Sequence, residues 1–471
     1  MAAQKMNAFP SQRQLGLVLA LIVAAAGVWL FAHSRDKQSR SGRRPFVSFE
    51  LVEPVLQALA NELPPELKEP NQAKWRSWAH HQDDIVRARL ERGALDSMIN
   101  LLLFGTSFTA QPRIMRMSDS DDPIVQSRVD DLLQALHNPG NNERLIFLRD
   151  ILRRNGMDPD SLAGYAKTKT FILENLRRVV QEQISFQQQA NDASRDNNQE
   201  AELSKRSHMF RDRGISLDTI ILSSFGIDAT LRDLKERAVL AQKSIARVAI
   251  IGPGLDFTDK GFGYDFYPLQ TLQPFAVDDS LIRLGLAEPG KIKITAFDIS
   301  QEVLEHLRRA RDRARNGQKY VVQLPRESWP WAAEAVQYWR SFGSEIGFDV
   351  TPIDPPPALK GLETRAAAIR PEVVLSCEPV DLNVVFEELD RSPDKRFDLI
   401  VATNVFLYYD TLQQALALQN ISTLLRSGGL LLTNDWLPHV PQIPMSPIGY
   451  TPVKYGESGD WGDNVFWWQR Q

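Results

Sequence analysis

The chain has little of several features that mark common functional classes. Its 471 residues include one cysteine, Cys377, which excludes an intrachain disulfide and a metal site built from several cysteines. Positive charge is not in excess: the formal net charge is −4, so we expect no nucleic-acid partner. His80 and His81 are metal-ligand types, but adjacent residues on a helix point about 100° apart. We therefore predict no metal site.

One long apolar run lies near the beginning of the chain. Residues 15–32 span about 18 residues, enough to cross a hydrocarbon core as a helix. Basic residues follow the run more densely than they precede it, which predicts that the bulk of the chain lies in the cytoplasm. We expect a tail (1–14), a transmembrane helix (15–32) and a basic linker (33–46). A cleaved signal peptide is the alternative.

The next part of the chain, residues 47–240, shows mainly helical patterning. Apolar residues recur at helical spacing, for example Ile172, Leu176 and Val179. This predicts a mainly helical domain. Its role stays open: it could recognise a substrate, bind a partner, or cover one edge of a sheet.

Residues 241–471 have the pattern of an α/β domain, and their first strand is the clearest element. Arg247 begins the apolar run Val248–Ile251, as expected for a parallel strand buried on both faces. Gly252 and Gly254 follow, and glycine lets the backbone turn sharply and approach a ligand closely.

A second apolar strand, Lys291–Ile299, ends in an acidic residue, Asp298. In nucleotide-binding α/β folds, a carboxylate at this position accepts hydrogen bonds from both ribose hydroxyls. A strand-end role without ligand contact is the alternative. Ser300 is placed to cap the helix predicted over 301–316.

Further strands follow in the order that a parallel sheet requires. One runs through Arg396–Asp410, and another follows the Gly-Gly turn of Leu424–Asp435. Tyr450–Gln471 predicts a terminal antiparallel pair. Asp398 lies near the start of its strand, away from the expected pocket edge, so we assign it a structural role.

This series resembles the class I S-adenosylmethionine-dependent methyltransferases over about the last half of the chain. The run from Asn404 through Tyr408 to Asp410 is similar to the chemotaxis-receptor methyltransferases. The motifs that carry the wider resemblance are Gly252-Pro-Gly254, Asp298, Phe397-Asp398, Asn404 and Ser427-Gly428-Gly429.

The chain departs from the family pattern at three positions. The acid that usually stands two residues before the first glycine is replaced by Ile250. Asp256 stands where a third glycine is frequent, and Thr403 stands where the chemotaxis enzymes have arginine before the asparagine. The first two departures concern the methionine end of the cofactor.

The resemblance implies S-adenosylmethionine as cofactor and a Rossmann-like sheet. We expect Gly252, Gly254, Asp256 and Asp298 to contact the cofactor. Val373–Leu382 predicts the third strand and its exit loop. An acid there, Asp381 or alternatively Glu378, would meet the adenine amino group.

Asn404 is our candidate for orienting the acceptor or the cofactor, because an amide both donates and accepts hydrogen bonds. Tyr408, or its neighbour Tyr409, would face the sulfonium or line the acceptor pocket. Methyl transfer is an in-line displacement that depends on alignment and electrostatics, so no covalent nucleophile is required.

Two long segments interrupt the α/β pattern. The connection Asp256–Gly290 carries aromatic residues and is either a lid over the ligand edge or a packed loop. The insertion at about 318–371 contains a helix predicted around Ala332–Phe342 and either shapes the acceptor pocket or covers surface.

The sequence thus favours a membrane-anchored methyltransferase whose acceptor is a small molecule, a lipid headgroup or a protein. A degenerate methyltransferase fold that binds or scaffolds at the membrane is the alternative. A nicotinamide-dependent oxidoreductase is disfavoured, because Phe257 replaces the last glycine of its motif and Asp298 lies about 44 residues beyond Gly254 instead of about 20.

Overall fold

The computed structural model describes residues 44–115, 122–193, 213–219, 221–260, 265–326, 331–356, 359, 362–457 and 461–471. Residues Phe46–Gln471 form one compact unit, which contains all of the described helices and strands. The predicted tail, the predicted membrane span (15–32) and most of the linker lie outside the described residues. A search of the described helices finds none that is long and apolar enough to cross a membrane.

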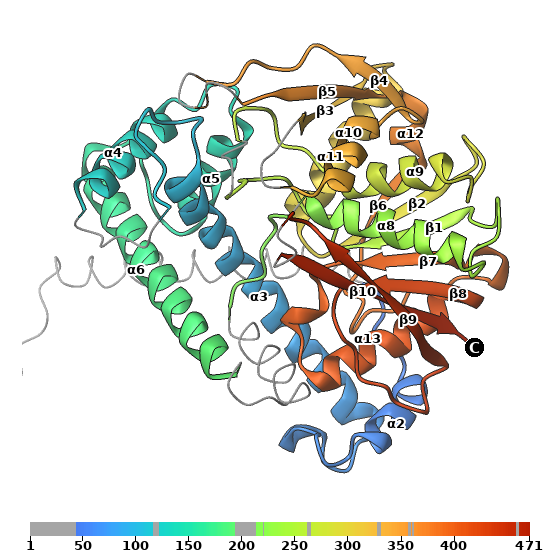
Figure 1. Cartoon of the computed structure of the whole chain (residues 1–471). Helices are drawn as coiled ribbons and strands as arrows, with labels where there is room; N and C mark the ends of the chain where they lie inside the picture. Colours follow the sequence, from blue (N-terminus) through green and yellow to red (C-terminus); the bar gives the residue numbers. More distant parts are fainter. Residues whose placement is uncertain are drawn as a thin grey trace, which may run out of the picture. The chain divides into compact units, whose positions relative to one another are not determined.

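A seven-stranded sheet forms the centre of the C-terminal half (Figure 1). Five strands run parallel in the order β6 (Cys377–Asp381), β2 (Lys293–Asp298), β1 (Arg247–Ile251), β7 (Phe397–Ala402), β8 (Leu425–Thr433). The sheet continues with the antiparallel pair β10 (Gly462–Arg470) and β9 (Met445–Lys454). The predicted Rossmann-like sheet with a terminal antiparallel pair is confirmed.

Helices cover both faces of this sheet, which explains the unbroken apolar run of β1. Val248 and Ile250 enter one core cluster, whereas Ala249 and Ile251 enter another. The first cluster includes side chains from α8 (Leu222–Glu236), α9 (Gln273–Arg283), α10 (Gln301–Arg315) and α11 (Ala333–Ser341). The second includes side chains from α2 (Phe49–Ala58), the first half of α3 (Gln72–Phe104) and α13 (Thr411–Leu424).

The helical region packs onto the sheet through a third core cluster. The second half of α3 joins α4 (Pro123–His137), α5 (Glu143–Arg154) and α6 (Leu162–Ala193) there. Leu255, Phe257 and Val303, which follow β1 and β2, belong to the same cluster. The helices therefore position the chain that leaves the carboxyl ends of the central strands.

A buried arginine strengthens this junction. Arg144 of α5 donates hydrogen bonds to the backbone carbonyls of Asp256, Phe257 and Tyr267. Its side chain is 1% exposed, so these carbonyls satisfy a charge that water cannot reach. The segment after β1 is thus fixed by the helical region.

The insertion after α10 forms a second, antiparallel sheet that the sequence did not predict. Its strands are β3 (Tyr320–Pro325), β5 (Thr364–Ile369) and β4 (Gly347–Val350), in that order. The helix predicted around 332–342 is confirmed as α11. Short 3-10 helices elsewhere are η1 (Pro65–Leu67), η3 (Pro393–Lys395) and η4 (Phe406–Tyr408).

One local prediction is wrong. The strand predicted over Val373–Leu382 begins instead as a helix, α12 (Pro371–Ser376), with Pro371 in its first turn, where its fixed φ and missing N–H suit a helix start. The strand is limited to β6. The predicted Gly-Gly turn is an irregularity within β8: Phe397 pairs with Leu425 and Leu399 with Leu430, so residues 426–429 are out of register, and Gly428 has φ of +72°.

Candidate functional site

A cavity of about 550 Å³ lies at the carboxyl ends of β1, β2 and β7. Ligands bind at this edge in open α/β sheets, and the volume is typical of a small-molecule site. The structure brings six of the seven predicted positions together in its walls: Gly252, Gly254, Asp256, Asp298, Asn404 and Tyr408. The seventh, Asp381, is not among the lining residues.

The glycine turn forms one wall and requires glycine at both positions. Gly252 and Gly254 each have φ of +64°, a conformation that other residues adopt at a cost. A Cβ on Gly252 would lie 2.8 Å from Val405 Cγ2, and one on Gly254 would lie 2.9 Å from Thr219 Cβ. The sharp turn that the sequence predicted is therefore present, and the space beside each glycine is filled by Val405 or Thr219.

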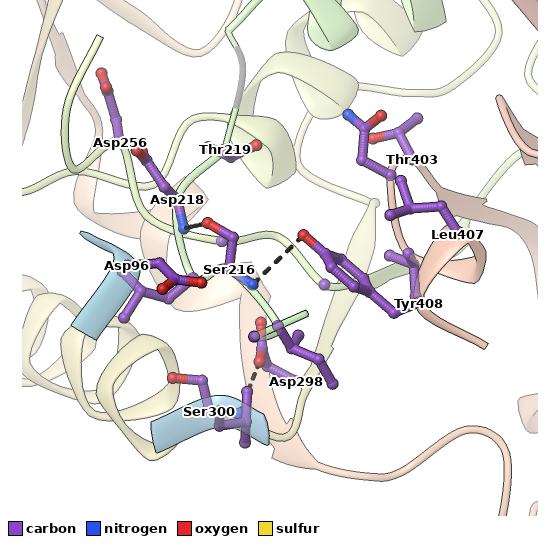
Figure 2. Close-up of a pocket in the computed structure, with 18 of the residues that line it drawn as sticks. Asp96, Ser216, Asp218, Thr219, Asp256, Asp298, Ser300, Thr403, Leu407 and Tyr408 are labelled. Atoms are coloured by element: carbon purple, nitrogen blue, oxygen red, sulfur yellow. Dashed lines mark hydrogen bonds between the residues drawn. The ribbon is translucent and has the colours of Figure 1, made fainter. Parts of the chain in front are cut away.

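Asp298 ends β2 and faces the cavity (Figure 2). Its Oδ1 accepts a hydrogen bond from the backbone N–H of Ser300 at 2.8 Å. Burial raises the pKa of Asp298 to about 7, against the opposing effect of backbone N–H groups of Ser300, Ile299 and Gly254. Ser300 occupies the N-cap position of α10, but its side chain makes no cap hydrogen bond, so its predicted capping role is wrong.

Asn404 is held in one orientation by a polar chain from neighbouring strands. It has φ of +58°, and its N–H donates to Asn434 Oδ1 at 2.7 Å. Asn434 Nδ2 in turn donates to Asn404 Oδ1 at 2.8 Å and to Asp463 Oδ2 at 2.6 Å. These bonds fix the Asn404 side chain at the cavity wall.

Tyr408 joins the end of β7 to a segment far away in sequence. Its hydroxyl accepts a hydrogen bond from the Ser216 N–H at 3.4 Å (Figure 2). Arg89 of α3 donates to the Tyr408 carbonyl at 2.9 Å, and burial raises the pKa of the Tyr408 phenol. Tyr409, the alternative candidate, also lines the cavity and is buried.

Asp256 is engaged in contacts within the protein. Its Oδ2 accepts hydrogen bonds from Tyr267 Oη and Gln270 Nε2, both at 2.8 Å, and burial raises its pKa to about 6. These bonds hold residues 267–270 against Asp256. Asp265 also accepts hydrogen bonds from the N–H groups of Thr106 and Ser107. The described part of the connection is a packed loop, not a lid.

Neither of the acids predicted to meet an adenine is among the residues that line the cavity, although Asp381 is the strand partner of Asp298. Asp381 pairs with Arg87 at 3.4 Å and accepts from Gln301 Nε2 at 2.6 Å. Glu378 lies exposed on the edge strand β6. The cavity wall at this side is apolar and is formed by Leu382 and Val384, just beyond β6. Asp398, by contrast, accepts from the N–H groups of Ala246 and Arg247 at the opposite edge of the sheet, as expected for a structural residue.

Sequence analysis missed the segment 213–219, which closes one side of the cavity. It crosses α3 where Gly93 meets Gly214 and Ile215 in direct backbone contact. It then pairs with the chain after the glycine turn, because Thr219 N–H donates to Leu255 O and Leu255 N–H donates to Leu217 O. Its short, irregular pattern gives no signal in the sequence, and only Gly214 marks the crossing.

The cavity is therefore shared between the sheet and the helical region. Leu90, Asp96 and Asn100 of α3 and Val179 of α6 line it. Trp331 from the insertion and Trp461, directly before β10, also contribute. The helical region is part of the site wall, and the insertion contributes as well.

No family model matches the chain, and no curated protein matches it. Solved structures that resemble this chain include several methyltransferases, some of them solved with S-adenosylmethionine or S-adenosylhomocysteine.

Three of these structures illustrate the likeness. The N-methyltransferase NodS from Bradyrhizobium japonicum WM9 has 10% identity and a TM-score of 0.24, covering 53% of this chain and 95% of NodS. The glycopeptide N-methyltransferase MtfA with S-adenosyl-L-methionine has 12% identity and a TM-score of 0.24, covering 52% of this chain and 93% of MtfA. Magnesium protoporphyrin IX methyltransferase from Synechocystis PCC 6803 has 9% identity and a TM-score of 0.24, covering 59% of this chain and 94% of that enzyme. At these TM-scores the functional argument depends on the geometry of the site itself.

Proposed function

We propose that this protein is an S-adenosylmethionine-dependent methyltransferase whose acceptor is not yet identified. One observation carries the proposal: a single cavity joins the glycine turn, the acid at the end of β2 and the polar residues after β7. In a parallel sheet these three features lie at the carboxyl edge, where a nucleoside-containing ligand binds.

The cavity fits such a methyl donor along the sheet. Asp298 would accept hydrogen bonds from the ribose hydroxyls, and the apolar Leu382 and Val384 would cover the adenine. Gly252 and Gly254 line the cavity and would place their backbone beside the methionine end. The bound donor would supply a methyl group already activated by a sulfonium.

The protein's own contribution would be alignment and exclusion of water. Asn404, fixed by Asn434, would orient the acceptor or the donor. Tyr408 would present its ring and hydroxyl to the reacting groups, held in place by Arg89 and Ser216. No nucleophilic side chain is required.

Calorimetric titration of the full chain, purified in mild detergent, with S-adenosylmethionine and S-adenosylhomocysteine tests the proposal. We expect micromolar binding that Asp298→Ala abolishes. Asp398→Asn is the matched control, because Asp398 lies at the opposite edge of the sheet and Asn keeps an acceptor for the N–H groups of Ala246 and Arg247. Folded protein that binds neither ligand would refute the proposal.

A degenerate fold that binds or scaffolds is the second candidate function. Two observations favour it: Ile250 replaces the usual acid, and the Asp256 carboxylate is already bonded to Tyr267 and Gln270. Incubation with radiolabelled methyl donor and membrane extract, or small-molecule fractions, distinguishes the two. Donor binding without any transfer favours the scaffold.

We also propose that residues 15–32 anchor the protein in a membrane, with the catalytic part in the cytoplasm. The support is the apolar run and the basic cluster that follows it. Carbonate extraction of membranes and protease protection of vesicles test the anchor and its orientation. Release of the intact chain by carbonate, or an N-terminus beyond residue 32, would contradict this arrangement.

A further inference from the structure

The methionine end of the proposed donor carries an ammonium group, and β1 has no side chain to meet it. The family's usual acid is replaced by Ile250, which is 0% exposed and belongs to the apolar core. A bound ammonium group without an opposite charge would be costly at a partly closed site. A carboxylate from another part of the chain is therefore required if the donor binds here.

Asp218 lies where such a carboxylate is needed. It forms an isolated bridge with Leu255, directly after the glycine turn. Its Oδ1 accepts hydrogen bonds from the N–H groups of Phe257 at 3.0 Å and Thr258 at 3.3 Å. Both bonds are made to Oδ1 and orient the carboxyl group, and none of the residues that the structure describes forms a hydrogen bond to Oδ2.

Asp218 lies at the end of the cavity where the amino-acid group of the donor is expected, away from the ribose position that Asp298 marks. Asp298 belongs to β2, so the donor would extend from there past β1 toward β7. The segment that carries Asp218 spans this same interval, from Ser216 beside Tyr408 after β7 to Leu255 after β1. In the view of Figure 2, Ser216 lies between Asp218 and Asp298.

A positive charge accompanies Asp218. Lys260 also lines the cavity and is close enough that its charge lowers the Asp218 pKa, while burial raises that pKa to about 7 overall. An α-amino-acid group carries one ammonium and one carboxylate, so the pair Asp218 and Lys260 has the complementary charges.

We propose that Asp218 replaces the carboxylate that β1 lacks and binds the ammonium group of the donor's amino-acid end, with Lys260 beside the donor carboxylate. This rests on the proposed function, since it assigns the charged end of the same ligand. If Asp218 binds the ammonium group, segment 213–219 and not the first strand determines selectivity for donors that carry an amino-acid group.

The test compares two ligands that differ at this end. S-adenosylhomocysteine has the amino-acid group, whereas 5′-methylthioadenosine keeps the adenosine and the thioether without it. Asp218→Asn retains the shape and the Oδ1 acceptor for Phe257 and Thr258 but loses the charge. We expect it to weaken S-adenosylhomocysteine binding about 10- to 100-fold and to leave 5′-methylthioadenosine binding within about twofold. Lys260→Ala should likewise weaken the binding of S-adenosylhomocysteine more than that of 5′-methylthioadenosine.

Asp398→Asn is the matched control, because Asp398 is a carboxylate at the opposite edge of the sheet, where it accepts hydrogen bonds from the N–H groups of Ala246 and Arg247. It should leave the ratio of the two affinities unchanged. Equal weakening of both ligands by Asp218→Asn, or no weakening of S-adenosylhomocysteine, would overturn the inference. Failure of the wild-type protein to bind either ligand would instead overturn the proposed function, and this inference with it.

Discussion

Gly254→Ala is the substitution from which the structure allows the most detailed expectation. Gly254 has φ of +64°, and a Cβ there would lie 2.9 Å from Thr219 Cβ and 3.2 Å from Leu217 O. The new methyl group therefore pushes against the segment that carries Asp218. Gly285 has a similar φ of +70° but nothing within 4 Å of its Cβ position, so Gly285→Ala isolates the backbone cost.

The cost of the backbone conformation and the cost of the new contacts can be estimated separately. Placing alanine in the left-handed region costs about 1–2 kcal/mol, and this applies to both variants. Contact with Leu217 and Thr219 adds about 1–3 kcal/mol in Gly254→Ala, as for other overpacked sites. The unfolding free energy should therefore fall by roughly 2–5 kcal/mol in Gly254→Ala and by about 1–2 kcal/mol in Gly285→Ala.

Urea denaturation of both variants measures this difference, and titration with S-adenosylhomocysteine measures its effect on the site. Displacement of residues 217–219 should reduce affinity by at least about tenfold in Gly254→Ala, whereas Gly285→Ala should bind as the wild type does. Equal losses of unfolding free energy in the two variants would show that segment 217–219 does not pack on the glycine turn, and would refute the reasoning.

Further outcomes follow from buried charges. Arg144→Met should reduce the unfolding free energy by more than about 3 kcal/mol in urea denaturation, because three backbone carbonyls lose a charged donor, whereas the exposed Arg153→Met should have little effect. Affinity for S-adenosylhomocysteine should rise from pH 6 to pH 8 as Asp218, facing Lys260 and Asp256, loses its proton; a flat profile would contradict this. The unfolding free energy should decrease as pH rises from about 4 to 7, because buried carboxyl groups with raised pKa values hold protons that the unfolded chain has released; Asp278→Asn should reduce this slope. These carboxyl groups are Asp218, Asp256, Asp278, Asp279, Asp298, Asp435 and Glu387.

Local patterns in the sequence determined the central part of the fold. The apolar run of β1 predicts a strand covered on both faces, and Val248 and Ala249 indeed enter different core clusters. Gly252 and Gly254 predict a turn with positive φ, which only glycine adopts readily. The acid at the end of β2 predicts a side chain at the carboxyl edge, because parallel strands bring their ends together. Each of these signals depends on a few consecutive residues.

Tertiary structure alone decided which polar side chains remain available to a ligand. Asp256 and Asp381 have the expected residue type and position along the chain, but Tyr267 and Gln270 engage the first, while Arg87 and Gln301 engage the second. Arg87 lies 294 residues before Asp381 in the sequence. No local pattern reports a contact over such a separation.

The same reason explains why segment 213–219 and α3 were not recognised as parts of the site. Ser216 meets Tyr408 across 192 residues of sequence, and Arg89 meets it across 319. Their side chains have no spacing that distinguishes them from an ordinary helix or loop. Sequence by itself determined the sheet, its glycine turn and the acid beside it, because those are local. The opposite wall depended on how distant segments pack, and only the folded chain specifies that.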